Sequence, residues 1–507
     1  LIVIKCKKHT VMGVTRFVKS RGWSTVCRFV RWPGTNGHTG SRMTIARKSR
    51  LCAVSLILAG LSSQAQANQT AAPPSVVRMT TSDRAMVDDL EHRTFLWFWE
   101  AADPQTGLIP DRYPSPQTFD SVASIGFGLT AYGIGAERHY ITREQAAERT
   151  LTTLRYLSRL PENDSKDQSS GFHGFFYHFL DPKTGLRLNP DIELSSIDTA
   201  LLMQGILFSQ SFYDRNTSQE TEIRNLADSL YKRVDWQWMK RPDNRLSMGW
   251  GPEHQFISNY WEGYSEGMMA YILGLGSPEQ DYALTPASWK AWLSTNFAPL
   301  FGHQYSHAWI DFRGIQDDWV RGKSVDYFEN SRRAAYAQRA YAMANPGGWH
   351  DYSATVWGLT ASDGPGEITQ KVDGKDKRFM SYVARGTGRD YVQDDGTIAP
   401  TAAVGSIAFA PEIVLPAIRE MKSRYGKQVY GKYGFVDAFN PSFQDGKTFW
   451  SDREYVGIDQ GPILLMIENW RDGFVWNVMK RNPYIRTGLQ RAGFSGGWLE
   501  TKNAQSE

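Results

Sequence analysis

Cysteine is scarce in this chain, and its three copies all lie near the N-terminus. They are Cys6, Cys27 and Cys52, so no cysteine occurs from Ala53 onward. This long remainder can therefore contain no disulfide bond, no thiol nucleophile and no cysteine-ligated metal centre. Its stability must come from packing, hydrogen bonds and ion pairs among the other residue types.

Acidic residues are absent from the first 67 residues, which hold 12 lysines and arginines and so carry +12. The whole chain carries +4, so residues 68–507 carry −8. The isoelectric point of about 8.7 thus reflects the basic N-terminal segment. A mildly acidic remainder argues against nucleic acid or an anionic membrane as the main partner.

Long hydrophobic runs are also missing, apart from one short run that spans residues 51–61. It follows Met43 and three basic residues, and it leads into Ala65-Gln66-Ala67. The run is too short to cross a bilayer, and the small residues at its end suit signal peptidase. We expect residues 43–67 to be a signal peptide, and the protein to be periplasmic or secreted without membrane attachment.

No linker rich in proline, serine or glycine divides the rest of the chain. We therefore predict a single large domain over residues 83–495, followed by a tail at 496–507. Residues 1–42 are interpreted as an over-extended gene start, and residues 68–82 as a flexible leader. We expect the protein to be a monomer.

Strand-like alternation is scarce, and helical periodicity dominates. Thr142 and Gln145 form the pattern of a capping box at the start of one predicted helix. Helices are predicted at 84–100, 142–160, 196–211, 219–239, 260–274, 286–296, 325–344, 401–422 and 460–474.

Two kinds of predicted helix alternate along the chain. Residues 142–160 and 219–239 are amphipathic and charged, as expected of helices that face water on one side. Residues 121–133, 198–205 and 401–410 are apolar all round and rich in small residues, which predicts burial on every side. Together with a weak repeat of Asp-Pro-x-Thr-Gly-Leu, first at 103–108 and again at 181–186, this pattern favours an all-α toroid of helical hairpins.

Glu262 and Glu266 are the first candidate carboxyl pair. With Asn259 as an N-cap, they are expected four residues apart on one helical face, among aromatic and small neighbours. Such surroundings favour a protonated carboxyl, which a general acid requires. The alternative for Glu262 is stabilisation of the first helical turn through the helix dipole. Glu266 fits that alternative poorly, because it lies one turn further along.

Glu193 and Asp198 form a second candidate group, ahead of an apolar helix. Asp459 has the same position relative to the apolar run that begins at Ile463. We expect these acids at the N-terminal ends of buried helices, facing a cavity. A capping or dipole role is the alternative interpretation for Asp198.

Aromatic and polar residues cluster between these segments, as expected of a sugar-binding groove. We interpret residues 303–313 as a loop lining a cleft. His303 and His307 could ligate a metal, but no established metal-binding, phosphate-binding or Gly-x-Ser-x-Gly motif is present, so we predict no metal and no cofactor. The candidate substrate-binding residues are Glu262, Tyr264, His307, Trp309, Asp311, Arg313, Trp349 and Trp357.

Several motifs together resemble the bacterial glucoamylase-like domain, the group that contains glycoside hydrolase family 144 and the C-terminal module of cyclic β-1,2-glucan synthases. The resemblance covers roughly Arg84 to Phe494. It implies an (α/α)6 toroid, a β-1,2-glucan substrate, inversion of the anomeric centre and no metal cofactor. The motifs lie at 193–202, 263–268, 275–278, 307–314, 345–349, 357–365 and 457–462.

The same resemblance assigns Glu266 as the candidate acid. The Gly-Tyr-Asn-Glu-Ala-Met-like motif of the family aligns with Gly263 to Met268, where this chain has Ser265 and Gly267 in place of Asn and Ala. Asp198 and Asp459 also fall in family motifs, and either could direct the attacking water. Hydrolysis of another β-glucan linkage, a polysaccharide lyase on a similar toroid and a non-catalytic carbohydrate-binding protein are the alternatives.

Overall fold

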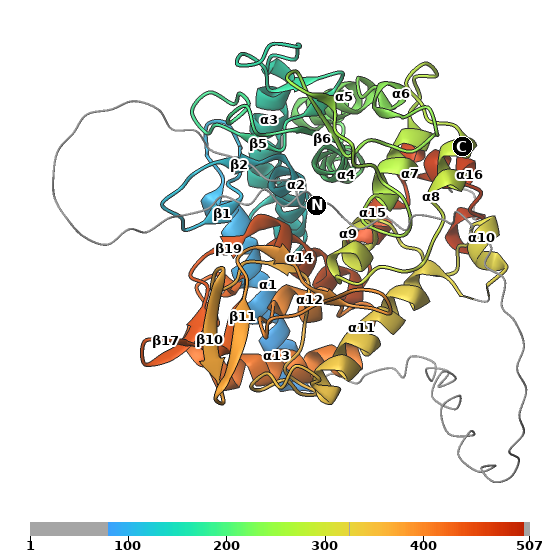
Figure 1. Cartoon of the computed structure of the whole chain (residues 1–507). Helices are drawn as coiled ribbons and strands as arrows, with labels where there is room; N and C mark the ends of the chain where they lie inside the picture. The colour runs from blue at the N-terminus through green and yellow to red at the C-terminus, as the bar shows by residue number, and fades with distance from the viewer. Residues whose placement is uncertain (1–79, 324, 501–507) are drawn as a thin grey trace, which may run out of the picture. The chain divides into compact units, whose positions relative to one another are not determined.

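The computed structural model of this protein describes residues 80–323 and 325–500, and the described part is mostly helical (Figure 1). The predicted gene start, signal peptide and most of the predicted leader lie outside the described residues, as does the end of the tail. None of the described helices has both the length and the apolar character needed to cross a membrane.

Six helices form a closed inner ring, since each packs on the next and the last contacts the first. The ring lies near the centre of Figure 1. The link between the fourth and fifth is made by Gln304, whose Nε2 donates to the carbonyl of Ala402 at 2.9 Å and to the Ser406 hydroxyl at 3.0 Å. The inner helices are α2 (Val122–Glu137), α4 (Ser196–Phe212), α7 (Met268–Gly276), α9 (Phe301–Trp309), α12 (Pro400–Val404) and α14 (Gly457–Arg471).

Six outer helices each precede an inner helix in the chain and pack against the ring. They are α1 (Thr81–Ala101), α3 (Arg143–Arg159), α5 (Ser218–Lys232), α8 (Pro286–Trp292), α11 (Tyr327–Ala344) and α13 (Pro411–Tyr425). The capping box of α3 is confirmed, since Thr142 Oγ1 accepts from the Gln145 amide at 3.1 Å and Gln145 Oε1 accepts from the Thr142 amide at 2.8 Å. This alternation is consistent with the expected (α/α)6 toroid.

Short strands lie in the connections that run from an outer helix to the N-terminus of the next inner helix. The pairs β1–β19 and β2–β5 and the three-stranded sheet β6–β7–β8 join neighbouring connections at the end of the ring where the inner helices begin. The strands are β1 (Arg112–Tyr113), β2 (Asp120–Ser121), β3 (Gly171–Phe172), β4 (Phe175–Phe176), β5 (Phe179–Leu180), β6 (Leu194–Ser195), β7 (Gly249–Gly251), β8 (Gln255–Phe256), β9 (Ala361–Ser362), β10 (Ile368–Val372), β11 (Lys375–Phe379), β12 (Val383–Ala384), β13 (Gly386–Thr387), β14 (Val392–Gln393), β15 (Tyr430–Gly431), β16 (Gly434–Phe435), β17 (Phe439–Asp445), β18 (Thr448–Ser451) and β19 (Tyr455–Val456).

Shorter helices complete the described part. Among them, α15 packs against α4, α9 and α14, and the indole N–H of Trp476 donates to the His307 carbonyl at 2.6 Å. The short helices are α6 (Trp236–Met239), α10 (Asp318–Arg321), α15 (Phe474–Met479), α16 (Pro483–Arg491), η1 (Gly426–Gln428) and η2 (Gly497–Leu499).

Several local predictions are wrong. The single helix expected over 219–239 is two helices, α5 and α6, and the one expected over 401–422 is also two, the inner helix α12 and the outer helix α13. The helix expected over 260–274 begins only at Met268, because backbone hydrogen bonds hold the preceding segment extended, including one from Trp261 to Leu246 at 2.8 Å. Gly263 then turns the chain with φ of 69°. The supposed cleft-lining loop at 303–313 is largely helix α9, whose residues are buried in the ring.

Candidate active site

Three of the four predicted catalytic carboxyl groups lie at the N-terminal ends of inner helices. Asp198 is in the first turn of α4, Asp459 is in the first turn of α14, and Glu266 lies two residues before α7 begins. All three are buried. The phenol of Tyr305 on α9 has a pKa raised well above its ordinary value, first by burial and then by charges that include Asp459, Glu266 and Asp198. Each of the three carboxyl groups is therefore close enough to Tyr305 for its charge to act on the phenol.

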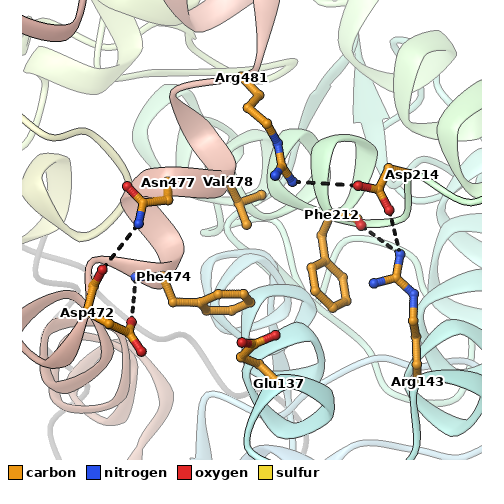
Figure 2. A pocket seen from close by; sticks show the side chains of 9 residues that line it. All are labelled: Glu137, Arg143, Phe212, Asp214, Asp472, Phe474, Asn477, Val478 and Arg481. Carbon is orange, nitrogen blue, oxygen red and sulfur yellow. Dashed lines mark hydrogen bonds and ion pairs between the residues drawn. The ribbon is translucent and has the colours of Figure 1, made fainter. Parts of the chain in front are cut away.

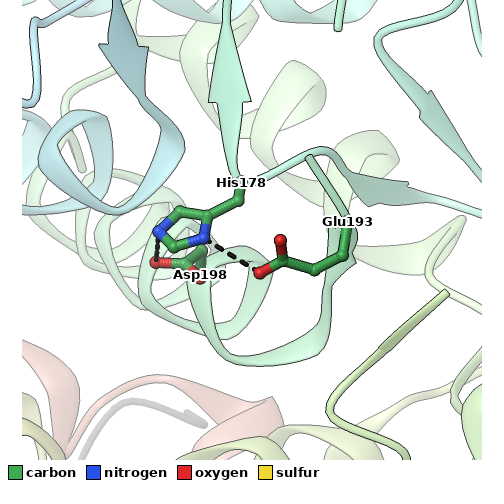
Figure 3. Close-up of side chains that lie close together, drawn as sticks. All are labelled: His178, Glu193 and Asp198. Atoms are coloured by element: carbon green, nitrogen blue, oxygen red, sulfur yellow. Dashed lines mark hydrogen bonds and ion pairs between the residues drawn. The ribbon is translucent and has the colours of Figure 1, made fainter. Parts of the chain in front are cut away.

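The fourth, Glu193, acts together with a histidine (Figure 3). The His178 ring lies between two carboxylates, with Nδ1 2.9 Å from Glu193 Oε1 and Nε2 3.5 Å from Asp198 Oδ1. All three residues are buried. Burial by itself lowers the pKa of His178, but the charges of Asp198 and Glu193 outweigh it and raise the pKa to about 9. The imidazole is therefore protonated at neutral pH.

Ser195, not Asp198, is the N-cap of α4. Its hydroxyl accepts from the Asp198 amide at 3.2 Å and donates to Asp198 Oδ2 at 2.5 Å. Asp198 lies in the first turn of α4, so the alternative of a role at the helix N-terminus, through the helix dipole, stays open beside the catalytic one. Both Asp198 oxygens have a partner, one in Ser195 and the other in His178.

Asp459 lies in a different environment, beside a second buried carboxyl group, Asp437. Burial raises the pKa of Asp459 to about 7; a hydrogen bond with Asp437 lowers it, while Asp111 and Asp363 raise it. Burial and the Asp459 charge raise the pKa of Asp437 well above its ordinary range. Two carboxyl groups in contact cannot both ionise freely, so near neutral pH we expect the pair to hold one proton.

Arg112 supplies the positive charge on this side of the site. Its Nη1 lies 2.5 Å from Asp363 Oδ2 and 3.1 Å from Glu454 Oε2, and its Nε lies 3.1 Å from Asp111 Oδ2. Asp363, Glu454 and the nearby Asp452 have the composition of a cation-binding group, as do His178, Glu193 and Asp198. In both groups a protein cation already lies between carboxylates. The absence of a metal stays a prediction.

Sequence reasoning missed several of these residues. His178 lies in an apolar stretch without a recognisable motif, and Arg112 is far along the chain from two of the acids that it contacts, Asp363 and Glu454. A single sequence carries no signal for such long-range pairs. The one available clue was the position of each acid directly before a buried helix, and that clue identified Asp198 and Asp459.

Glu262 does not share a helical face with Glu266, because residues 260–267 are not helical. More than half of its side chain is exposed, and it pairs with Arg245. The predicted pairing of Glu262 and Glu266 is therefore wrong, although Glu266 itself is buried at the site.

The candidate sugar-binding aromatic residues are packed inside the protein. Trp309 and Trp357 have no exposed surface, and the Trp309 indole N–H donates to Thr130 Oγ1 at 2.9 Å. Trp349 belongs to a hydrophobic cluster with Val372, Phe379 and Phe443. Tyr264 is likewise buried, and its hydroxyl lies 3.1 Å from that of Ser331. This packing favours structural roles for the four rings.

His307, Asp311 and Arg313 lie towards the other end of the ring, in the last turn of α9 and just beyond it. Burial, followed by the neighbouring His303, lowers the pKa of His307 to about 3. Asp311 pairs with Arg313 at 2.8 Å and with Lys480 at 2.6 Å. These contacts join α9 to the segment that follows α15.

A pocket of about 340 Å³ also lies at that end (Figure 2). Phe212 and Phe474 approach each other across it, and charged side chains surround them. Phe212 ends α4, whereas Asp198 begins it, so the two sites are separated by about 20 Å along the helix. The pocket therefore lies away from the carboxyl groups.

Comparison with known proteins agrees with this arrangement. The family model described as "Putative glucoamylase" matches residues 258–483. A solved structure from Bacteroides uniformis, also described as a putative glucoamylase, is 30% identical with a TM-score of 0.71. The match covers 83% of this chain and 100% of that one. The chain belongs to this glucoamylase-like family.

Two further members carry more specific descriptions. The endo-β-1,2-glucanase from Chitinophaga pinensis, solved with sophorotriose and glucose, is 27% identical with a TM-score of 0.71; the match covers 83% of this chain and 100% of that one. An exo β-1,2-glucooligosaccharide sophorohydrolase from Parabacteroides distasonis is 27% identical over 81% of this chain. The aligned region spans only 58% of the length of that relative.

Proposed function

We propose that this protein is a glycoside hydrolase that cleaves β-1,2-glucan and releases sophoro-oligosaccharides. The observation that carries the proposal is the position of Asp198, Glu266 and Asp459 near Tyr305, at the N-terminal ends of inner helices. Glycoside hydrolysis requires two carboxyl groups with different protonation states. The β-1,2-glucan specificity of two relatives that share this fold supports the substrate.

The proposed reaction inverts the anomeric centre, with Glu266 as the general acid that protonates the glycosidic oxygen. We assign Asp459 as the base. Its Oδ2 is buried and has no hydrogen-bonding partner within the described part of the chain, so it can accept a proton from water. Asp198, by contrast, has both oxygens engaged by Ser195 and His178, and as a carboxylate it would place a negative charge close to the reacting sugar. That charge would stabilise the developing oxocarbenium ion.

The decisive test is the pair of variants Glu266→Gln and Glu222→Gln. Linear and cyclic β-1,2-glucan are supplied, the products are separated, and their anomeric configuration is followed by NMR. We expect Glu266→Gln to fold normally and to release no sophoro-oligosaccharides. Glu222 forms an exposed ion pair with Arg155, so its variant should match the wild type. Near-normal turnover by Glu266→Gln would refute the acid assignment, and products of retained configuration would refute inversion.

Screening other β-glucan linkages tests the substrate itself. Cleavage of another linkage at a higher rate than β-1,2 would replace the proposed substrate while keeping the reaction class. A polysaccharide lyase would instead give an unsaturated product that absorbs ultraviolet light. The acidic cluster around Arg112 does not suit the uronates that lyases bind, since like charges repel.

We also propose that the protein acts in the periplasm or outside the cell, because residues 43–67 have the pattern of a signal peptide. Expression from Met43 in a bacterial host and mass spectrometry of the exported protein test this directly. A mature N-terminus at Asn68 is expected, and retention of the intact segment in the cytoplasm would contradict it.

A further inference from the structure

His178 lies between two carboxylates that belong to different parts of the chain. It follows β4, whereas Glu193 precedes β6 and Asp198 lies in α4 (Figure 3). The backbone fixes the ring's position, because the His178 amide donates to the Glu193 carbonyl at 3.0 Å and its carbonyl accepts from Val122 at the start of α2. Phe179 stacks on the ring at a centroid separation of 3.9 Å. The imidazole therefore has little freedom to turn.

His178 is a cation surrounded by negatively charged side chains. Glu193 contacts one ring nitrogen and Asp198 the other, and Asp111 adds a further negative charge from the connection between α1 and α2. Arg112, the cation next to Asp111 in the chain, is paired with that acid. A neutral imidazole has only one N–H donor, whereas the cation has two. Only the cation can donate to both carboxylates at once.

We infer that His178 is a positioning residue for the hydrolysis: held by Glu193 at one ring nitrogen, it contacts Asp198 with the other and fixes the orientation of that carboxyl group at the reacting sugar. Glu193 then serves to hold His178, and does not contact substrate. This inference rests on the proposed function for its effect on catalysis, but the protonation state of His178 can be measured without any substrate.

The first test is NMR of the whole protein with ¹⁵N-labelled histidine, using His178→Gln to assign the ring signals. We expect both His178 nitrogens to stay protonated at pH 7 and to titrate near pH 9. In Asp198→Asn the midpoint should fall by more than one pH unit. His303 and His307 are matched controls, because burial lowers the pKa of His303 to about 4 and that of His307 to about 3. A neutral His178 at pH 7 would overturn the inference.

The second test compares His178→Asn with His178→Gln. An Asn amide can replace Nδ1 and keep the contact with Glu193, whereas the longer Gln amide can replace Nε2 and keep the contact with Asp198. We expect His178→Asn to lower kcat about 100-fold with little change in KM, since misplacing a catalytic group by about 1 Å costs that much. His178→Gln should retain more of kcat. Equal rates for both folded variants and the wild type would overturn the inference.

His173→Asn serves as a control, because His173 pairs with Asp235 away from the carboxyl cluster and Asn can reproduce its Nδ1 contact. Treatment with EDTA tests for a metal ion held by His178, Glu193 and Asp198, and loss of activity that Zn²⁺ restores would overturn the inference.

The two hypotheses can fail separately. A wild type that releases no sophoro-oligosaccharide but shows a protonated His178 refutes only the proposed function. An active wild type with a neutral His178 refutes only this inference.

Discussion

At the scale of single residues, Asp198 and Asp459 are both buried carboxyl groups, but their neighbours differ. Asp198 lies against the protonated ring of His178 and the hydroxyl of Ser195. Asp459 lies among other acids: burial and the charges of Asp111 and Asp363 raise its pKa, which is about 7, although a hydrogen bond with Asp437 lowers it. Asp459 can therefore gain or lose a proton near neutrality.

This difference predicts the pH dependence of the reaction. The pKa of Asp459 is raised to about 7, so the base is increasingly protonated as the pH falls below that value. We expect kcat/KM to decrease about tenfold per pH unit on the acid side of about pH 7. In Asp363→Asn a negative charge that raises the pKa of Asp459 is removed, and the acid limb should move to lower pH. An acid limb that stays in place in this variant would argue against Asp459 as the base.

A buried ion pair outside the site provides a stability prediction. Arg385 and Asp395 have no exposed surface, and the guanidinium binds the carboxylate through two contacts, at 2.7 and 2.9 Å. Replacing Arg385 with Leu leaves the Asp395 charge buried without its partner. We expect the free energy of unfolding to fall by about 3–5 kcal/mol in urea titrations.

The exposed pair of Arg155 and Glu222 is the matched control for that experiment. It also has two short contacts, both at 2.6 Å, but each side chain is more than 40% exposed. Arg155→Leu should change stability by less than about 1 kcal/mol. Equal losses of unfolding free energy in Arg385→Leu and Arg155→Leu would show that burial does not determine how much these ion pairs contribute to stability.

At the scale of helices and turns, the inner ring depends on small residues where α2 and α4 cross. A Cβ added to Gly205 would lie 2.0 Å from the carbonyl oxygen of Gly126, and one added to Gly126 would lie 2.2 Å from that of Leu201. The two backbones therefore approach more closely than any other residue type would allow. The small residues predicted to be buried on every side therefore also let α2 and α4 pack closely.

Gly205→Ala should accordingly force α2 and α4 apart. We expect a loss of about 1–3 kcal/mol in the free energy of unfolding, and a lower Tm in a thermal melt. Gly322→Ala is the control, since the nearest atom to an added Cβ there is 3.7 Å away. An unchanged Tm for Gly205→Ala would contradict the close packing.

The weak sequence repeat also has a structural counterpart. Asp103 and Asp181 each accept hydrogen bonds from the two amides that lie two and three residues further on, at 2.8–2.9 Å for Asp103 and 3.0 Å for Asp181. Both turns precede a connection that enters an inner helix. The repeat therefore marks equivalent turns in successive hairpins, as the prediction of repeated hairpins requires.

At the scale of the whole molecule, the buried histidines of α9 link stability to pH. The folded-state pKa is about 4 for His303 and about 3 for His307, below the unfolded value of about 6.5. Between the folded-state and unfolded-state pKa values, these histidines bind more protons in the unfolded chain than in the folded protein. Their contribution to stability therefore falls as the pH decreases. We expect these two histidines together to contribute about 4 kcal/mol less to the free energy of unfolding at pH 5 than at pH 7, whereas His178 and Asp459, whose pKa values are raised, contribute in the opposite direction.

Urea titrations at the two pH values measure this effect. The double variant His303→Gln, His307→Gln should be less stable than the wild type at pH 7, and this deficit should shrink by about 4 kcal/mol at pH 5, because the variant lacks the two groups that gain protons on unfolding. His254→Gln changes an exposed histidine and should leave the difference in stability between pH 7 and pH 5 unchanged. A double variant with the full wild-type difference would assign the acid sensitivity to other groups.

The sequence by itself determined the helical class, the alternation of amphipathic and buried helices and the positions of Asp198 and Asp459, because periodicity and local composition carry these features. Tertiary structure decided the rest. Residues 260–267 remain outside a helix because they bond to a neighbouring strand region, and Glu262 is thereby separated from Glu266. The pairing of His178 with Asp198, and of Asp437 with Asp459, depends on which connecting loops pack together at the N-terminal ends of the inner helices. Local sequence does not predict such contacts between distant segments.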